Sequence, residues 1–93
     1  MSVIKIEDWT VIHRTVSPLL AAEGRTLHLK GRVWNHPRWP AGGAATTSPV
    51  VGRLGNLIMT KSGSVYELGK ACAEYAAQFT DAAQELLQSL PDI

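Results

Sequence analysis

The sequence predicts an α+β fold, in which a small antiparallel sheet or a partly open SH3-like barrel of about five strands is followed by a C-terminal amphipathic helix. Two observations predict it. Short segments rich in β-branched and aromatic residues recur between tight-turn signals, and the hydrophobic period then changes from two to about 3.6 residues. The 93 residues suffice for one small domain, 1–93, around a single core.

The first strand is predicted from Trp9 to Val16, within a segment rich in β-branched residues. Ser17 and Pro18 then favour one or two helical turns over 18–23, because serine caps helices and proline is preferred at their first position. A glycine at position 24 can end that turn.

The segment RTLHLKGRVW, residues 25–34, alternates between two kinds of side chain and predicts the second strand. Leu27, Leu29 and Val33 are expected to face the core. The opposite face is expected to be basic and aromatic, with His28, Lys30, Arg32 and Trp34. The next segment, 35–44, is predicted to be a loop, because two prolines lack backbone donors and two adjacent glycines relax the chain.

Three further strands are predicted, separated by tight turns. They are Thr46 to Val51, Leu57 to Thr60 and Val65 to Leu68, with turns at Gly55-Asn56 and Ser62-Gly63. Short strands at this spacing are typical of an antiparallel meander or a partly open barrel.

After Gly69 the apolar side chains recur at steps of three and four residues, which predicts one helix over 70–90 that ends before Pro91. The stripe consists of Cys72, Tyr75, Phe79, Ala83, Leu86 and Leu90. A break at Thr80-Asp81 is the alternative, since these residues can cap a second helix. We expect the stripe to pack on the sheet. Leu86, Leu87 and Leu90 are also candidates for contact with a second copy, so a homo-oligomer is expected.

Charge is distributed unevenly along the chain, although the net charge is only +1. Residues 24–66 contain no acidic residue and six basic ones, which are Arg25, Lys30, Arg32, Arg38, Arg53 and Lys61. Residues 67–93 contain one basic residue and five acidic ones. A fold that gathers the middle segment on one face will attract anionic partners.

No catalytic or metal site is predicted, and no cofactor is expected. The three histidines have no metal-ligand spacing, and the middle segment has no carboxylate to pair with them. Ser62 and Ser64 flank a glycine in a predicted turn, where serine is common for conformational reasons. AGGA at 41–44 lacks the lysine of a phosphate-binding loop. Cys72, as the single cysteine, is expected to be a small buried hydrophobe.

Basic residues interleaved with aromatic ones are the strongest functional signal. The predicted binding residues are His28, Lys30, Arg32, Trp34, His36, Arg38 and Trp39, joined by the hydroxyls of Thr47 and Ser48. Arginine binds phosphate oxygens in pairs, and indole rings stack on bases. The pattern suits a nucleic acid, a nucleotide or an acidic protein surface. The alternative is that Trp34 and Trp39 fold back as a small core under stacked arginines.

Residues 31–69 carry the motifs GxVxxHPR, a glycine loop, a Thr-Ser turn and SGSxYxLG. This pattern resembles short uncharacterised proteins of bacteriophages and prophages. The resemblance implies a small barrel-like domain and a viral origin, and it transfers no catalytic residue. Small phage proteins without enzymatic motifs frequently act by binding: they block a host defence complex, sequester a nucleotide signal or adjust host transcription.

The leading hypothesis is a non-enzymatic binding protein that inhibits a bacterial defence system. It would mask a host protein complex or sequester an anionic nucleotide ligand through the basic-aromatic face. A sequestering protein of this size predicts an oligomer with Arg32, Trp34 and Arg38 near an interface. The alternative is a nucleic-acid-binding accessory or regulatory domain of the small-barrel type. The absence of a long apolar run and of a secretory signal predicts the cytoplasm of the host cell and no membrane partner.

Overall fold

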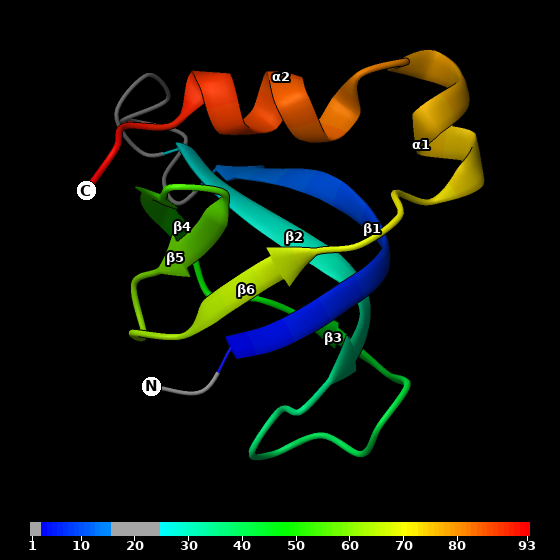
Figure 1. Cartoon of the computed structure of the whole chain (residues 1–93), viewed down its shortest axis with the longest axis vertical. Coiled ribbons are helices and arrows are strands. Elements are labelled where there is room, and N and C mark those ends of the chain that lie inside the picture. The colour runs from blue at the N-terminus through cyan, green and yellow to red at the C-terminus, as the bar shows by residue number, and fades with distance from the viewer. Residues whose placement is uncertain (1–2, 16–24) are drawn as a thin grey trace.

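The computed structural model describes residues 3–15 and 25–93, and within them six strands form one sheet that two short helices follow (Figure 1). The strands are β1 (Val3–Thr15), β2 (Arg25–Trp34), β3 (Gly43–Thr46), β4 (Val50–Leu54), β5 (Leu57–Thr60) and β6 (Val65–Leu68). The helices are α1 (Ala73–Gln78) and α2 (Ala82–Ser89). This confirms the α+β class. The helical turn predicted over 18–23 lies outside the described residues.

The strand order is β3-β2-β1-β6-β5-β4, and the central pair β1 and β6 is parallel. The sheet is therefore mixed, and the prediction of an antiparallel sheet is wrong at this pair. The strands form two antiparallel groups, β1-β2-β3 and β4-β5-β6. The two groups join where β6 pairs in parallel with the first residues of β1, Val3 to Ile6.

The sheet is strongly curved, because consecutive strands β3 and β4 lie at its two opposite edges. A flat sheet of six strands would separate its edge strands by about 24 Å. The three residues 47–49 that join β3 to β4 can span only about 14 Å. Among the described residues no ladder pairs β3 with β4, so the sheet curls without closing.

The predicted strand bounds hold for β2, β5 and β6 and fail elsewhere. β1 begins at Val3, six residues before the predicted start, and its register shifts between Glu7 and Thr10, where Asp8 has a φ of 54°. This irregularity hides the alternation of the strand in the sequence. The predicted strand Thr46 to Val51 is two strands, since Pro49 between them offers no backbone donor. The predicted loop is shorter, 35–42, because Gly43 and Ala44 already pair with β2.

One continuous helix over 70–90 is wrong, and the alternative with a break is correct. α1 ends at Gln78, Phe79 has an extended backbone, and α2 begins after Asp81. The break turns the chain so that α2 can place Ala82 and Leu86 on the sheet. The packing of the stripe is confirmed in part, since Phe79 is 43% exposed. Leu86 is buried there and has no surface left for a second copy, so its assignment to self-association is corrected. Leu87 and Leu90 pack half-buried against the same core.

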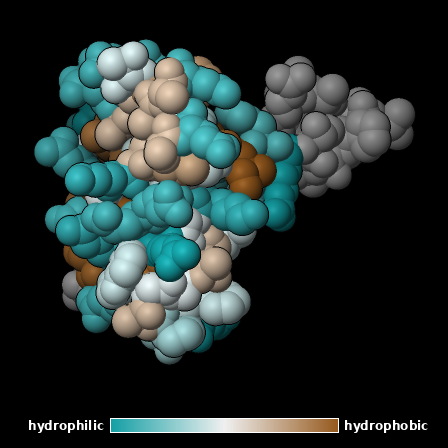
Figure 2. Space-filling model, turned by 90° about the vertical axis from the view of Figure 1, so that its right-hand side faces the viewer, coloured by the Kyte–Doolittle hydropathy of each residue, from teal (hydrophilic) through white to brown (hydrophobic). Residues whose placement is uncertain are grey.

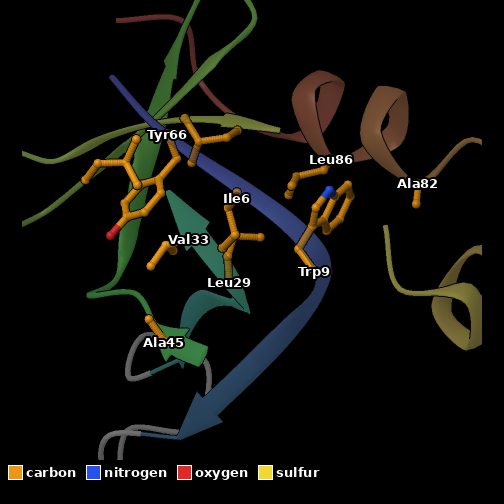
Figure 3. Packing of buried hydrophobic residues seen from close by; sticks show 10 residues of the cluster. Ile6, Trp9, Leu29, Val33, Ala45, Tyr66, Ala82 and Leu86 are labelled. Carbon is orange, nitrogen blue, oxygen red and sulfur yellow. The ribbon is translucent and has the colours of Figure 1, made fainter. Parts of the chain in front are cut away.

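The core extends from the helices to the far end of the sheet (Figure 3). Trp9 is fully buried next to Leu86, and its Nε1 donates a hydrogen bond to the Gly69 carbonyl at 3.0 Å. Tyr66 lies at the other side of the cluster, and its hydroxyl points away from Trp9. The same core therefore supports α2 at one end and a tyrosine hydroxyl at the other.

The segment 91–93 returns to the sheet beside β4. The Arg53 N–H donates to the Pro91 carbonyl at 2.9 Å, and the Ile93 N–H donates to the Arg53 carbonyl at 2.8 Å. Arg53 Nη1 also lies 3.9 Å from Asp92 Oδ2. This segment covers the outer edge of β4. Its Asp92 also pairs with Arg53, one of the six basic residues of the segment 24–66.

Candidate ligand-binding cleft

Loop 35–42 is held firmly at both ends. Asn35, with a φ of 66°, donates from Nδ2 to the Val3 carbonyl at 3.0 Å. At the other end the Gly42 N–H donates to the Val33 carbonyl at 2.8 Å. Between them Nδ1 of His36 accepts a hydrogen bond from the Arg38 N–H at 2.9 Å. Two prolines and these bonds limit the backbone conformations of the loop.

A cleft of about 410 Å³ lies between this loop, the segment that leaves β3 and the hairpin turn between β5 and β6. Its lining residues are His36, Pro37, Arg38, Trp39, Thr46, Thr47, Ser48, Ser62, Ser64 and Tyr66. Loop 35–42 lies at the end of the molecule opposite α2 (Figure 1). Five of the nine predicted binding residues therefore meet in one concavity, namely His36, Arg38, Trp39, Thr47 and Ser48.

Serine hydroxyls tie two walls of the cleft together. The hydroxyls of Ser48 and Ser62 share a hydrogen bond at 2.8 Å, and the Ser62 N–H donates to Ser48 Oγ at 3.3 Å. The hydroxyl of Thr60, which is buried, lies 3.1 Å from Ser62 Oγ. A hydroxyl can rotate to donate or accept, so this wall can present donors to an anion without a rearrangement of the backbone.

His28 is not part of an exposed basic face, and this prediction is wrong. The side chain is 7% exposed. Its Nδ1–H donates to the Thr47 carbonyl at 2.8 Å, and Nε2 lies 2.7 Å from Thr26 Oγ1. The cause is the segment after β3, which pairs with Leu29 through the Thr47 N–H and covers this part of β2. His28 therefore holds Thr47, which lines the cleft, by a hydrogen bond to its carbonyl.

The hydroxyl of Thr47 is likewise engaged in hydrogen bonds within the protein. Its Oγ1 accepts from the Leu29 N–H at 3.0 Å and donates to the Ser48 carbonyl at 2.8 Å. Thr46 and Ser62 are exposed, whereas Thr47 is 5% exposed, so their hydroxyls are more accessible to a ligand than the hydroxyl of Thr47.

Arg38 and Trp39 supply the charge and the aromatic surface. Trp39 is 47% exposed, and its ring meets the His36 ring edge-on at a centroid distance of 6.4 Å. Among the described residues Arg38 forms no ion pair, and no carboxylate lines the cleft. The cleft therefore offers a cation and an indole surface that the protein itself does not neutralise or cover.

Lys30, Arg32 and Trp34 lie outside the cleft. Lys30 lines an adjoining hollow that shares Trp39 and Thr46 with it. Arg32 is exposed on β2 between strands β1 and β3. Trp34 is 38% exposed and lines a separate hollow of about 280 Å³. Neither Trp34 nor Trp39 is buried as a second core. Figure 2 shows pale, neutral side chains gathered at the lower end of the molecule, where Figure 1 places the loop.

Two side chains of the cleft have shifted proton affinities. Desolvation lowers the pKa of His36, and the neighbouring positive charge of Arg38 lowers it further. Burial raises the pKa of Tyr66, and a hydrogen bond with Ser64 offsets part of this effect. At neutral pH the imidazole and the phenol are therefore both uncharged, and Arg38 carries the formal charge of the cleft.

Ser62, Ser64 and Tyr66 line the cleft but were predicted only as turn and strand residues. Ser62 and Ser64 lie in the turn before β6, where the alternation of a strand does not apply, so no periodic signal in the sequence marks them. The sequence also does not reveal that the curvature of the sheet brings this turn opposite the loop.

The fold and the cleft together define a small α+β protein with an open mixed sheet and a hydroxyl-lined, cation-bearing concavity. No family model, curated protein or solved structure matches the chain. Within residues 3–15 and 25–93 no group of three histidine, cysteine or acidic side chains is placed to hold a metal ion. In the same part of the chain no helix has the length and hydrophobicity to cross a membrane.

Proposed function

We propose that this protein is a non-enzymatic binding protein that captures an anionic nucleotide in the cleft between loop 35–42 and the β5–β6 turn. In this proposal it is a small phage-type protein of the bacterial cytoplasm, and it inhibits a host defence system by sequestering a nucleotide signal. The proposal rests on one observation. Arg38, Trp39 and several hydroxyl groups line the same cleft, and no carboxylate of the described residues lines it.

Each part of a nucleotide has a matching group in the cleft. The guanidinium of Arg38 can bind two phosphate oxygens at once, and the hydroxyls of Ser62 and Ser64 can donate to others. The exposed indole of Trp39 offers a face on which a base can stack. The cleft volume of about 410 Å³ lies within the range of about 300–1,000 Å³ that is usual for small-molecule sites.

A concave site favours sequestration of a small molecule over masking of a protein complex, since protein interfaces of that kind are larger and flatter. The finer fold assignment belongs to the same proposal. The strong curvature of the open sheet supports a partly open SH3-like barrel whose one end carries the binding loop.

The second candidate is a nucleic-acid-binding domain of the small-barrel type. It is favoured by the exposed cations Lys30 and Arg32 on β2. One observation argues against this candidate. Arg53 is paired with Asp92, so it is not free to contact the phosphates of a nucleic acid. Binding to DNA or RNA would fall steeply with salt, in proportion to the number of phosphates contacted.

Native mass spectrometry of the protein purified gently from its host tests the proposal, because it reads both a retained nucleotide and the number of copies. Calorimetry with AMP then measures the contribution of Arg38. We expect Arg38→Ala to weaken binding about 10- to 100-fold, as for loss of a charged hydrogen bond.

Lys70→Ala is the matched control, because it removes one exposed cation just before α1 that does not line the cleft. It should bind as the unchanged protein does. If no nucleotide is retained and AMP does not bind, or if Arg38→Ala binds as well as the control, the cleft is not a nucleotide site.

A further inference from the structure

We propose that the ligand is a dinucleotide with a 5′-phosphate, laid across Trp39 so that one phosphate lies on each side of the indole. This inference rests on the proposed function, and it assigns a second subsite with Lys30 as its cation. The first subsite is the cleft of Arg38 and the serines.

The second subsite is a hollow of about 360 Å³ lined by Lys30, Trp39, Ala44, Ala45 and Thr46. The register of β2 and β3 forms its floor, since Lys30 lies opposite Thr46 in the antiparallel ladder. The small side chain of the exposed Ala44 leaves the space open, and Trp39 from loop 35–42 provides the side wall.

The two hollows meet at Trp39 and Thr46, because both residues line both hollows. A cation stands on each side of this junction, Arg38 in the first hollow and Lys30 in the second. Within the described residues neither lining contains a carboxylate. The order cation, indole, cation matches the order phosphate, base, phosphate along a short nucleotide chain.

Volume also favours two nucleotide units. Each hollow, at about 410 and 360 Å³, is near the lower end of the range of about 300–1,000 Å³ for a single small-ligand site. A mononucleotide would fill the first hollow and leave the second to solvent. The exposed methyl group of Ala44 in the second hollow then suits a second base.

The two cations differ in a way that sets the direction of the chain. The planar fork of an arginine suits a terminal phosphate with several free oxygens, and the serine hydroxyls add donors on the same side. A lysine acts as a point charge, which suffices for a phosphodiester with one negative charge. The 5′-phosphate therefore belongs beside Arg38 and the phosphodiester beside Lys30.

Calorimetry at fixed salt with AMP and with the dinucleotide pApA tests this inference. We expect the protein to bind pApA at least about tenfold more tightly than AMP, as for one added charged contact. Lys30→Ala should remove most of that advantage, whereas Arg38→Ala should weaken both ligands.

Lys61→Ala is the matched control, since it removes the same charge from an exposed turn residue that lines neither hollow. It should leave the preference for pApA in place, and thermal unfolding should show that all variants are folded.

If pApA binds no better than AMP, or if Lys30→Ala behaves like Lys61→Ala, the dinucleotide inference is wrong while the nucleotide site stands. If neither AMP nor pApA binds, both the dinucleotide inference and the proposed function are wrong. If a ten-nucleotide single strand binds far more tightly than pApA and with a steep salt dependence, the nucleic-acid alternative replaces both.

Discussion

The two ends of the sheet use the same residue types for opposite purposes (Figure 1). At the helical end Trp9 is 0% exposed under α2, and its indole N–H is bonded to a backbone carbonyl. At the cleft end Trp39 is 47% exposed beside Arg38 and a wall of hydroxyls. The neighbours of a tryptophan, and not its identity, decide whether it contributes stability or surface for a ligand.

Charge separates the two ends in the same way. Residues 67–93 carry five acidic residues and one basic one. This segment includes the end of β6 and both helices. The cleft has one arginine and no described carboxylate. This distribution would favour the approach of the proposed anionic ligand at the cleft end.

The largest expected effect is on the core tryptophan. We expect Trp9→Ala to lower the free energy of unfolding by about 3–5 kcal/mol, because it removes a fully buried ring and its hydrogen bond. Trp39→Ala should change stability by less than about 0.5 kcal/mol and abolish most nucleotide binding. Urea unfolding measures the first quantity and calorimetry the second.

Trp9→Phe provides a measurable variant if Trp9→Ala does not fold. It keeps most of the apolar surface and loses the bond to Gly69, at a cost of about 1–3 kcal/mol. A stability loss of similar size in Trp39→Ala would mean that loop 35–42 is part of the core, and the contrast between the two ends would disappear.

An intermediate effect is expected at Gly52, where the segment 91–93 packs on β4. A Cβ there would lie 2.7 Å from the Ile93 side chain and 2.8 Å from the Pro91 carbonyl oxygen, so the segment has to move. We expect Gly52→Ala to cost about 1–3 kcal/mol in urea unfolding. Adding Ile93→Ala should recover part of the loss, and no recovery would show that the side-chain clash is not its cause.

The smallest effect is a pH dependence that belongs to the cleft end. The pKa of His36 is lowered in the folded protein, so the unfolded chain binds its proton first as the pH falls. The stability from neutral His36 is complete above its unfolded pKa of about 6.5 and is lost as the pH falls through the folded value. Protonation also removes the acceptor for the Arg38 N–H.

Thermal unfolding at several pH values between about 5.5 and 7.5, about one pH unit on each side of the unfolded pKa, measures this dependence. His36→Asn keeps a hydrogen-bond acceptor near the position of Nδ1 and does not titrate, so its melting temperature should fall less on acidification. Equal slopes for both proteins would assign the dependence to the carboxylates.

Local patterns predicted the local features of the fold. Strands β2, β5 and β6 follow from alternation between clear turn signals, such as Gly55-Asn56. The parallel pairing of β1 with β6 joins segments about 60 residues apart, and no local pattern encodes it. The split of Thr46 to Val51 into two strands has a local cause, Pro49, but the placement of these strands at opposite edges of the sheet is long-range.

The candidate site divides in the same way. Arg38 and Trp39 were predictable because the loop that carries them is one continuous segment. Ser62 and Ser64 were not, since the curvature of the whole sheet brings their turn to the loop. His28 was misplaced because alternation identifies two faces of a strand but not which one the next segment will cover.

The pairing of residues 91–93 with β4 bears on colloidal behaviour. Exposed strand edges are the sites at which β proteins join one another into aggregates. Here one edge strand, β4, is covered by the chain's own segment, and the other, β3, is only four residues long. The proposed sequestration of a ligand would require a protein that remains dispersed when it is abundant. Loss of this short segment would expose the backbone of Arg53 and favour edge-to-edge polymerisation.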